Sequence, residues 1–262
     1  MKSIDVNRVY EMIESIAQFS STADGCTRLS YSKEDRAVRE YLNSMLSALP
    51  LSISTDPAGN LHARYTPSTA QYHEPIIIGS HIDTVPNGGK YDGVLGVVVA
   101  IEIVRSIIEY GIALLRPIEV IAFAEEEGSN FGVTSLGSKL MTGQLGYDDL
   151  IHLRSFDGVP AIDLLSAFGL NPTDLHNMET EKIHAFIELH IEQGPVLEQE
   201  NFAIGIVNSI IGQHVYYVRV LGESNHAGTT PMNARKDPVL CASSMISKIP
   251  GIIHKCNDKS LV

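Results

Sequence analysis

Histidine and carboxylate side chains are concentrated in four short stretches of this sequence, and mostly apolar runs or loops lead into them. The four stretches are His81-Ile82-Asp83, the single Asp92, the triplet Glu125-Glu126-Glu127, and the segment from His190 to Glu192. Imidazole and carboxylate groups are the ligands of borderline-to-hard divalent cations such as zinc and manganese. If the four stretches meet in the fold, they can form a site for one or two such cations.

The spacing within the stretches suggests a role for individual residues. In an extended chain Asp83 lies on the same side as His81, so it can accept the second ring N–H and fix the tautomer of a ligand histidine. Asp92 has two oxygens and can bridge two cations that lie about 3.5–4 Å apart. One glutamate of the triplet would complete the metal shell, and a neighbouring one would accept a proton from metal-bound water.

Each of these residues also has a purely structural interpretation. Asp92 precedes a predicted helix and can simply cap it, a histidine at a strand end is usually a hydrogen-bonded structural residue, and a glutamate triplet is usually a solvated loop. The metal interpretation is favoured because ligand-type residues occur at four separate strand or loop ends and hardly at all inside the strands. Three adjacent carboxylates also repel one another unless a cation or a proton relieves them.

Apolar patterning predicts the elements that position these stretches. Residues 75–80 and 118–124 are apolar runs of the kind found in strands buried on both faces. Between them, residues 94–108 carry apolar side chains at helical spacing, and this helix should stop before Gly111. Strand, helix and strand form a βαβ unit with parallel strands. Ligands bind beyond the carboxyl ends of such strands, where His81 and the glutamates are expected.

Further elements flank this unit. Helices are expected over residues 5–19, 33–49 and roughly 238–248, a strand–turn–strand over 52–65, a core strand over 185–191, and a half-exposed strand over 214–221. The predicted fold class is α/β, with a mixed, largely parallel sheet flanked by helices. The change of pattern from residue 213 predicts the start of a smaller α+β domain.

Composition excludes several classes of protein. With 262 residues, 44% hydrophobic and 19% charged, the chain is not a disordered or coiled-coil protein. A net charge of −12 disfavours nucleic acid as a partner. Three cysteines without CxxC spacing predict neither a disulfide framework nor a thiolate zinc site. The acidic N-terminus does not read as a signal peptide, and residues 94–108 are too short and too charged to span a membrane, so a cytoplasmic location is expected.

Four longer segments, in order along the chain, carry a resemblance to a known family. They are GSHIDTVPNGGKYDG, AFAEEEGSNFG, ELHIEQGPVLE and GESNHAGTTPMNARKDP, and TRLSYS and DPAGNLHAR near the start extend the similarity over nearly the whole sequence. The sequence resembles the amidase/hydantoinase-carbamoylase family, which includes allantoate amidohydrolases, N-carbamoyl-L-amino-acid hydrolases, ureidoglycolate hydrolases and β-ureidopropionases. That family belongs to the wider di-zinc aminoacylase/carboxypeptidase superfamily, so a di-zinc aminopeptidase-like catalytic domain is implied.

The resemblance also implies a role for each matching residue. It implies four metal ligands with the second one bridging, His81, Asp92, Glu127 and His190. It implies Glu126 as the general base, Asp83 as the partner of His81, and His226 as the residue that reaches across a dimer to stabilise the oxyanion. Gln193 and Gln213 are implied as polar contacts for the substrate, in addition to His226.

The implied reaction is the hydrolysis of a ureido or carbamoyl C–N bond, with release of ammonia and carbon dioxide, by a homodimer holding two zinc or manganese ions. Allantoate is the favoured substrate, because GQHVYYV followed by GESNHAGTTPM is most similar to that branch. N-carbamoyl-L-amino acids are the closest alternative, followed by ureidoglycolate or β-ureidopropionate, and a peptidase of the same superfamily is a third.

The length of the chain raises a further alternative. Family members run to roughly 400 residues, which suits a catalytic domain plus a lid domain. Residues 1–211 would then be the catalytic domain without its C-terminal part, and 212–262 the start of a lid and dimerisation domain. The family's last histidine ligand has no match here, so an inactive fragment is the alternative from another functional class.

Overall fold

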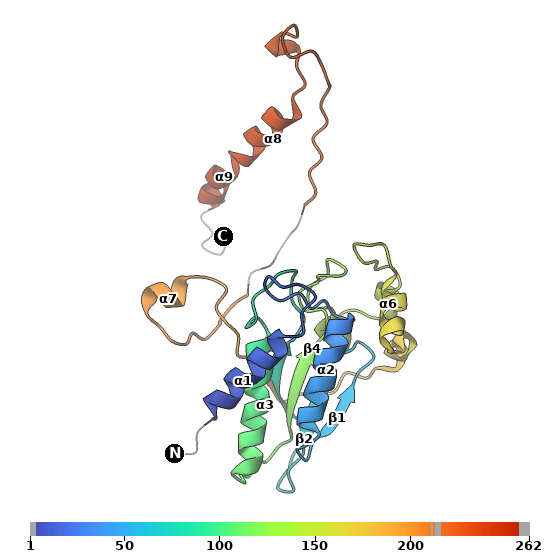
Figure 1. Ribbon diagram of the computed structural model, residues 1–262, viewed down its shortest axis with the longest axis vertical. Coiled ribbons are helices and arrows are strands. Elements are labelled where there is room, and N and C mark those ends of the chain that lie inside the picture. The colour runs from blue at the N-terminus through green and yellow to red at the C-terminus, as the bar shows by residue number, and fades with distance from the viewer. Residues whose placement is uncertain (1–3, 211, 213–215, 257–262) are drawn as a thin grey trace. The chain divides into compact units, whose positions relative to one another are not determined.

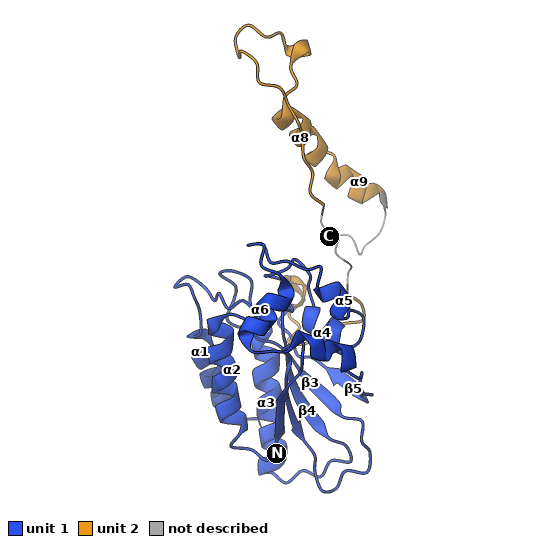
Figure 2. Cartoon of the chain, turned by 90° about the vertical axis from the view of Figure 1, so that its right-hand side faces the viewer, with its two compact units in different colours: residues 1–193 blue, residues 194–262 orange. Residues whose placement is uncertain are grey.

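The computed structural model describes residues 4–210, 212 and 216–256 of this chain (Figure 1). The chain divides into two compact units, residues 1–193 and 194–262, which are coloured separately in Figure 2. The sequence suggests a division later, after residue 211, and the assignment of the two parts to a catalytic and a lid domain remains a prediction.

A five-stranded mixed sheet forms the centre of the first unit. Its strands are β1 (Ser52–Thr55), β2 (Leu61–Tyr65), β3 (Ile76–His81), β4 (Ile118–Phe123) and β5 (Ala185–Ile187), arranged in the order β1-β2-β4-β3-β5. β3 is parallel to both β4 and β5, whereas β2 is antiparallel to both β1 and β4. The predicted mixed sheet is therefore confirmed, but two of its four pairings are antiparallel, so it is not largely parallel.

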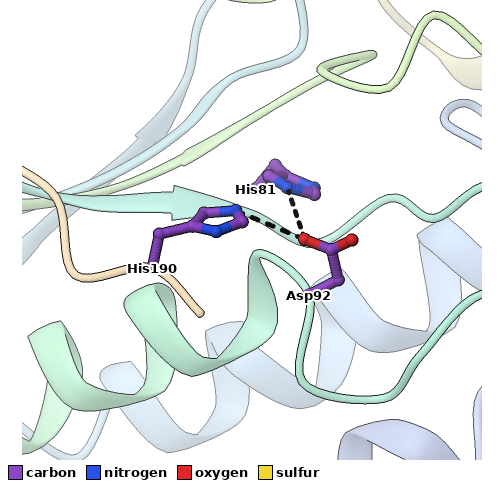
Figure 3. A group of neighbouring side chains, drawn as sticks. All are labelled: His81, Asp92 and His190. Carbon is purple, nitrogen blue, oxygen red and sulfur yellow. Dashed lines mark ion pairs between the residues drawn. The ribbon is translucent and has the colours of Figure 1, made fainter. Parts of the chain in front are cut away.

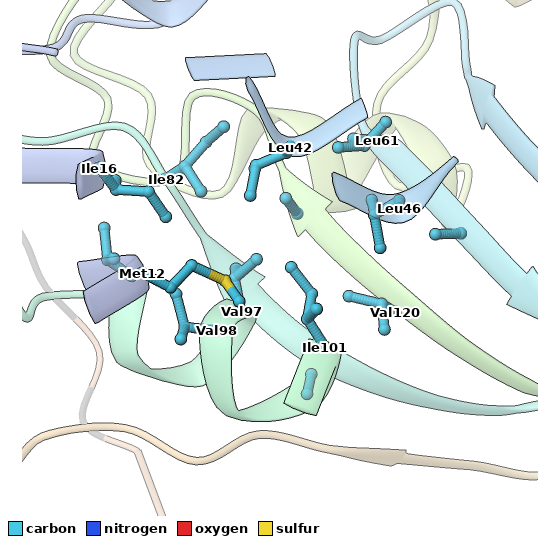
Figure 4. Close-up of a cluster of buried hydrophobic side chains, with 14 of the residues drawn as sticks. Met12, Ile16, Leu42, Leu46, Leu61, Ile82, Val97, Val98, Ile101 and Val120 are labelled. Atoms are coloured by element: carbon cyan, nitrogen blue, oxygen red, sulfur yellow. The ribbon is translucent and has the colours of Figure 1, made fainter. Parts of the chain in front are cut away.

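Three helices cover one face of this sheet (Figure 2). They are α1 (Val6–Ala17), α2 (Lys33–Leu46) and α3 (Val94–Glu109), close to the bounds that the apolar spacing predicts. Asp5 begins α1 by accepting hydrogen bonds from two backbone amides, and Ser32 caps α2 by accepting one from the amide of Asp35. The core between the helices and the sheet is shown in Figure 4 and includes Met12, Ile16, Leu42, Leu46, Leu61, Ile82, Val97, Val98, Ile101 and Val120.

The connection from β4 to β5 builds a second, smaller core that the sequence analysis did not assign. It contains α4 (Leu136–Met141), α5 (Tyr147–Leu150), α6 (Ala161–Phe168) and a 3-10 turn, η1 (Pro172–Asn177). Apolar residues of these short helices pack against Tyr31 and Phe131. Helices of four to eight residues are too short to show a clear periodic pattern, and their stability depends on this packing.

β5 is shorter than the strand expected over 185–191, and this expectation is corrected. It pairs along only three residues of β3, from Ile76 to Ile78, and it is the last strand of the sheet. Its side chains are largely exposed, with Ile187 58% accessible. Pairing therefore ends before His190, which lies in an irregular segment after the strand.

The described part of the second unit contains α7 (Val196–Glu200), η2 (Met232–Ala234), α8 (Pro238–Ile246) and α9 (Ile249–Cys256). α8 confirms the helix predicted from residue 238, and Asp237 caps it. The strand predicted over 214–221 is wrong for residues 216–221, which the structure describes without regular structure, while 214 and 215 lie outside the described residues. Alternating side chains form a strand only where another strand pairs with them, and Tyr217 is 96% exposed. None of the helices in the described ranges is both long and apolar enough to cross a membrane.

Candidate metal centre

The βαβ arrangement brings the ligand-type stretches to one edge of the sheet. His81 is the last residue of β3 and lies opposite Phe123, the last residue of the parallel strand β4. Asp92 lies in the loop that leads from β3 to α3, and His190 follows β5, which is also parallel to β3. Because parallel strands present their carboxyl ends at the same edge, residues far apart in the sequence meet there.

His81, Asp92 and His190 form a compact group (Figure 3). Each offers a ligand atom, and these atoms all lie within 4.8 Å of one another. Asp92 Oδ1 is 3.3 Å from His190 Nε2 and 3.9 Å from His81 Nε2. The two imidazole rings stack with their centroids 5.9 Å apart. Asp92 Oδ1 is buried and accepts no hydrogen bond from any residue that the structure describes.

The hydrogen bond that each ring makes at Nδ1 determines the tautomer of His81 and His190. His81 Nδ1 lies 2.9 Å from the backbone carbonyl oxygen of Asp83, and His190 Nδ1 lies 2.9 Å from that of Ile191. A carbonyl can only accept, so both Nδ1 atoms carry a proton, and a neutral ring then presents a lone pair at Nε2. With both rings neutral, two imidazole lone pairs and a carboxylate oxygen converge, and a divalent cation would satisfy all three.

Asp83 is buried beside this group and connects the ends of β3 and β4. Its backbone carbonyl is the hydrogen-bond partner of His81, whereas the predicted partner, its carboxylate, has Oδ1 3.7 Å from His81 Nδ1. Carboxylate Oδ2 accepts a hydrogen bond from the amide of Glu127 at 3.1 Å. Burial raises the pKa of Asp83, although His81 and the amides of the glutamate loop oppose that rise. Asp83 thus fixes the His81 tautomer through its main chain and the glutamate loop through its side chain.

The capping interpretation of Asp92 does not hold in the structure. The cap residue of α3 is Gly93, and no side chain in the described part of the chain makes a cap hydrogen bond there. The second oxygen of Asp92, Oδ2, instead accepts a hydrogen bond from Gln193 Nε2 at 2.8 Å. Gly93 has φ +65°, and a Cβ atom at this position would lie 2.4 Å from His81 Nε2. Only glycine allows the loop to pass this close to the ring.

The predicted acid–base glutamates lie in the loop after β4. Glu126 Oε1 accepts a hydrogen bond from Ser135 Oγ at 2.8 Å, while its buried Oε2 has no partner among the described residues. Burial raises the pKa of both Glu126 and Glu127, and the nearby charge of His81 opposes both rises. Glu127 is not part of the group within 4.8 Å, so the structure brings together three of the four predicted ligands.

Two predicted residues belong to the rest of the chain. His226 belongs to the second unit, is exposed, and accepts hydrogen bonds at Nδ1 from the amides of Gly228 and Thr229, so its Nε2 is available as a donor. Gln213 lies outside the described residues. Ser135 is not predictable from the sequence, because no spacing rule links it to Glu126. A Gly directly after Asp92 and before an apolar helix was the signal that could have identified Gly93.

Comparison with known proteins gives consistent matches. Residues 77–259 match the family described as peptidase family M20/M25/M40. An N-carbamoyl-L-amino-acid amidohydrolase of Paenarthrobacter aurescens is 38% identical over 98% of this chain and 63% of its own length. An allantoate amidohydrolase of Escherichia coli (strain K12) is 42% identical over 84% of this chain and 54% of its own length. The crystal structure of a hydantoinase/carbamoylase family amidase from Burkholderia ambifaria has a TM-score of 0.74 at 31% identity, over 97% of this chain and 62% of that one. This chain spans less than two thirds of the length of each of these proteins.

Proposed function

Because this chain belongs to peptidase family M20/M25/M40, we propose that it acts as a metal-dependent amidohydrolase on a ureido or carbamoyl group. The observation that carries the proposal is the convergence of Asp92 Oδ1 with the Nε2 atoms of His81 and His190. The reaction class is supported by the similar proteins, two of which are named amidohydrolases and one an amidase.

The proposed centre holds two divalent cations, zinc or manganese. His81, Asp92, Glu127 and His190 would hold them, with Asp92 as the ligand common to both ions. When bound, the cations polarise the substrate carbonyl and lower the pKa of the attacking water. Imidazole binds zinc well, and carboxylates also bind manganese, so the donor set supports either metal.

In this proposal Glu126 is the general base. Ser135 occupies its Oε1, which leaves the buried Oε2 as the atom that accepts the proton of the attacking water. Burial raises the pKa of Glu126, and a carboxylate with a raised pKa is a better proton acceptor near neutral pH. The same atom returns the proton to the leaving nitrogen. His226 Nδ1 already accepts hydrogen bonds from two backbone amides, so its Nε2–H would donate to the developing oxyanion.

The chemistry balances as a hydrolysis. Water adds to the carbonyl carbon, the terminal C–N bond breaks, and ammonia leaves with the proton that Glu126 carried. The carbamate that remains then loses carbon dioxide to give the amine. We propose allantoate as the substrate and N-carbamoyl-L-amino acids as the second candidate, since similar proteins carry both names. Gln193 and Gln213 are proposed substrate contacts.

A substrate panel tests this proposal. We expect the 262-residue chain loaded with zinc or manganese to release ammonia from allantoate faster than from N-carbamoyl-L-amino acids, and to cleave dipeptides least. The reverse order of the first two would change the substrate, and dipeptide cleavage as the fastest reaction would favour a peptidase. Full metal loading without turnover of any substrate would contradict the proposal for this chain and favour the inactive fragment.

Two further proposals concern assembly and location. A homodimer is proposed because the exposed His226 would then act on the site of a second copy. A cytoplasmic location is proposed because Cys26 and Cys241 are both free thiols, which a reducing compartment preserves.

A further inference from the structure

Two sequence motifs that have no role in the proposed mechanism, TRLSYS and DPAGNLHAR, hold the segment that follows β4. The backbone amide of Ala124 donates to Asn60 Oδ1 at 2.9 Å, and the next amide, that of Glu125, donates to Ser30 Oγ at 2.6 Å. Asn60 belongs to DPAGNLHAR and Ser30 to TRLSYS, and both side chains are buried. Two consecutive amides directly before Glu126 are therefore fixed by residues far away in the sequence.

Glu125 itself differs from the other two members of the triplet. It is fully buried, and its φ of +53° places it in the left-handed region that few non-glycine residues adopt. Its carboxylate turns toward its own loop, where Oε1 accepts the amides of Asn130 at 2.6 Å and Phe131 at 3.3 Å, and Oε2 accepts Asn130 Nδ2 at 2.7 Å. Glu125 therefore closes the loop over residues 125–131 instead of facing the site.

Asn130 completes a closed hydrogen-bond ring. Its Nδ2 group, which donates to Glu125 Oε2, also donates to the backbone carbonyl of Ser30 at 2.9 Å. Ser30 thus contacts the loop at both ends, through Oγ at Glu125 and through its carbonyl at Asn130. The ring leaves little freedom to the intervening residues, which include Glu126 and Glu127.

We propose that Glu125 is a positioning residue, which together with Ser30 holds the loop after β4 so that Glu126 and Glu127 face the group of His81, Asp92 and His190. This inference rests on the proposed metal centre. The competing explanation is that Glu125 only contributes to the stability of the first unit, like any buried carboxylate with several hydrogen bonds.

Glu125→Gln separates these two explanations. Glutamine has nearly the same shape and keeps one carbonyl oxygen for the amides of Asn130 and Phe131. Its NH₂ group, however, would face Asn130 Nδ2, donor against donor, so the ring opens. Asn130 cannot turn its amide around to compensate, because its oxygen would then face the carbonyl oxygen of Ser30.

Glu102→Gln is the matched control. Glu102 is also fully buried in the first unit and lies on α3, and its hydrogen-bond partners are Asp5, Arg8 and Ser106, none of which is a candidate site residue. Both variants replace one buried carboxyl group by an amide. Only the Glu125 variant should change the metal centre.

The experiment titrates the full chain and its variants with Co²⁺, following visible absorption, and records urea unfolding in parallel. We expect wild type and Glu102→Gln to bind Co²⁺ with the same affinity and spectrum. Partners that orient ligands typically contribute about 10–100-fold to metal affinity, so Glu125→Gln should bind weaker by that factor, with altered absorption bands. Ser30→Ala, which removes one contact of the ring, should weaken binding in the same direction.

The outcomes separate this inference from the proposal beneath it. A folded Glu125→Gln with wild-type affinity and spectrum would overturn the positioning role and leave the metal centre intact. If Glu125→Gln does not fold, Ser30→Ala decides, and unchanged Co²⁺ binding in that variant would overturn the inference. Wild-type chain that binds no Co²⁺ would overturn the metal centre and this inference with it.

Discussion

Asp92 is the residue at which the structural and the metal interpretations differ most. It does not cap α3, and its Oδ1 lies between the Nε2 atoms of His81 and His190. When both rings are neutral, these atoms present lone pairs to the carboxylate oxygen, and in the proposed metal-loaded protein all three atoms would be ligands. The residue should therefore matter for metal binding and little for folding.

We predict that Asp92→Asn folds with nearly unchanged stability and loses tight metal binding. Asparagine can place its NH₂ group against the lone pair of a neutral ring, but it has no charge to share with a cation. Because even indirect partners contribute about 10–100-fold to affinity, the loss should be at least about 100-fold. Calorimetric metal titration and a thermal melt measure both quantities. A variant that keeps its metal affinity but loses stability would return Asp92 to a structural role.

Glu126→Gln should behave in the opposite way. Its Oε2 is the proposed proton acceptor, and glutamine cannot take up a proton there. Removal of a general base typically lowers the rate by about 10²–10⁴-fold, so we expect a loss of that size in ammonia release. Metal content should stay at the wild-type value, as measured by elemental analysis after gel filtration. Metal loss in this variant, with retention in Glu127→Gln, would exchange the roles of the two glutamates.

At the scale of elements, a charged group joins β2, β4 and the turn before β2. His62 lies on β2, with Nδ1 2.6 Å from Glu119 of β4 and Nε2 3.2 Å from Asp56 of the turn. Burial alone would lower the pKa of His62, but the hydrogen bonds and charges of Asp56 and Glu119 outweigh it and raise the pKa to about 9. The imidazolium therefore links three segments of the first unit.

This link predicts a pH dependence of stability. The folded-state pKa of about 9 exceeds the ordinary value of 6.5, so the stabilisation is complete below pH 6.5 and disappears as the pH rises through 9. The shift corresponds to a loss on the order of 3 kcal/mol in the free energy of unfolding. Urea unfolding of wild type and His62→Gln at pH 6.5 and 9.5 isolates this contribution. A difference between the two proteins that is equal at both pH values would contradict it.

The elements were predictable from the sequence wherever local pattern decides them. α1, α2, α3 and the strands β3 and β4 follow from apolar spacing, and their parallel pairing brings His81 to the site edge. Tertiary packing decides the features that were not predicted. These are the short helices of the second core, the early end of β5, and the lack of a strand in the described residues 216–221. The contacts of Asp83 and Ser135 depend on the same tertiary packing, so spacing along the chain does not specify them.

At the scale of the whole molecule, the proposed metal ligands all belong to the first unit. His81, Asp92 and His190 lie within residues 1–193, and so do the glutamates of the triplet. The second unit supplies His226 and Gln213, for which the proposed roles concern the substrate. Metal binding can therefore be measured separately from turnover, and it tests the proposed metal centre more directly.

Zinc K-edge X-ray absorption on the zinc-loaded 262-residue chain tests the proposed metal centre most directly. We predict tight binding and a first shell of nitrogen and oxygen atoms at about 2.0–2.2 Å, with the scattering pattern of imidazole. In the Asp92→Asn variant, tightly bound zinc and this signal should disappear together. Zinc that binds only weakly, or a spectrum without imidazole that Asp92→Asn leaves unchanged, would contradict a metal centre built on His81, Asp92 and His190.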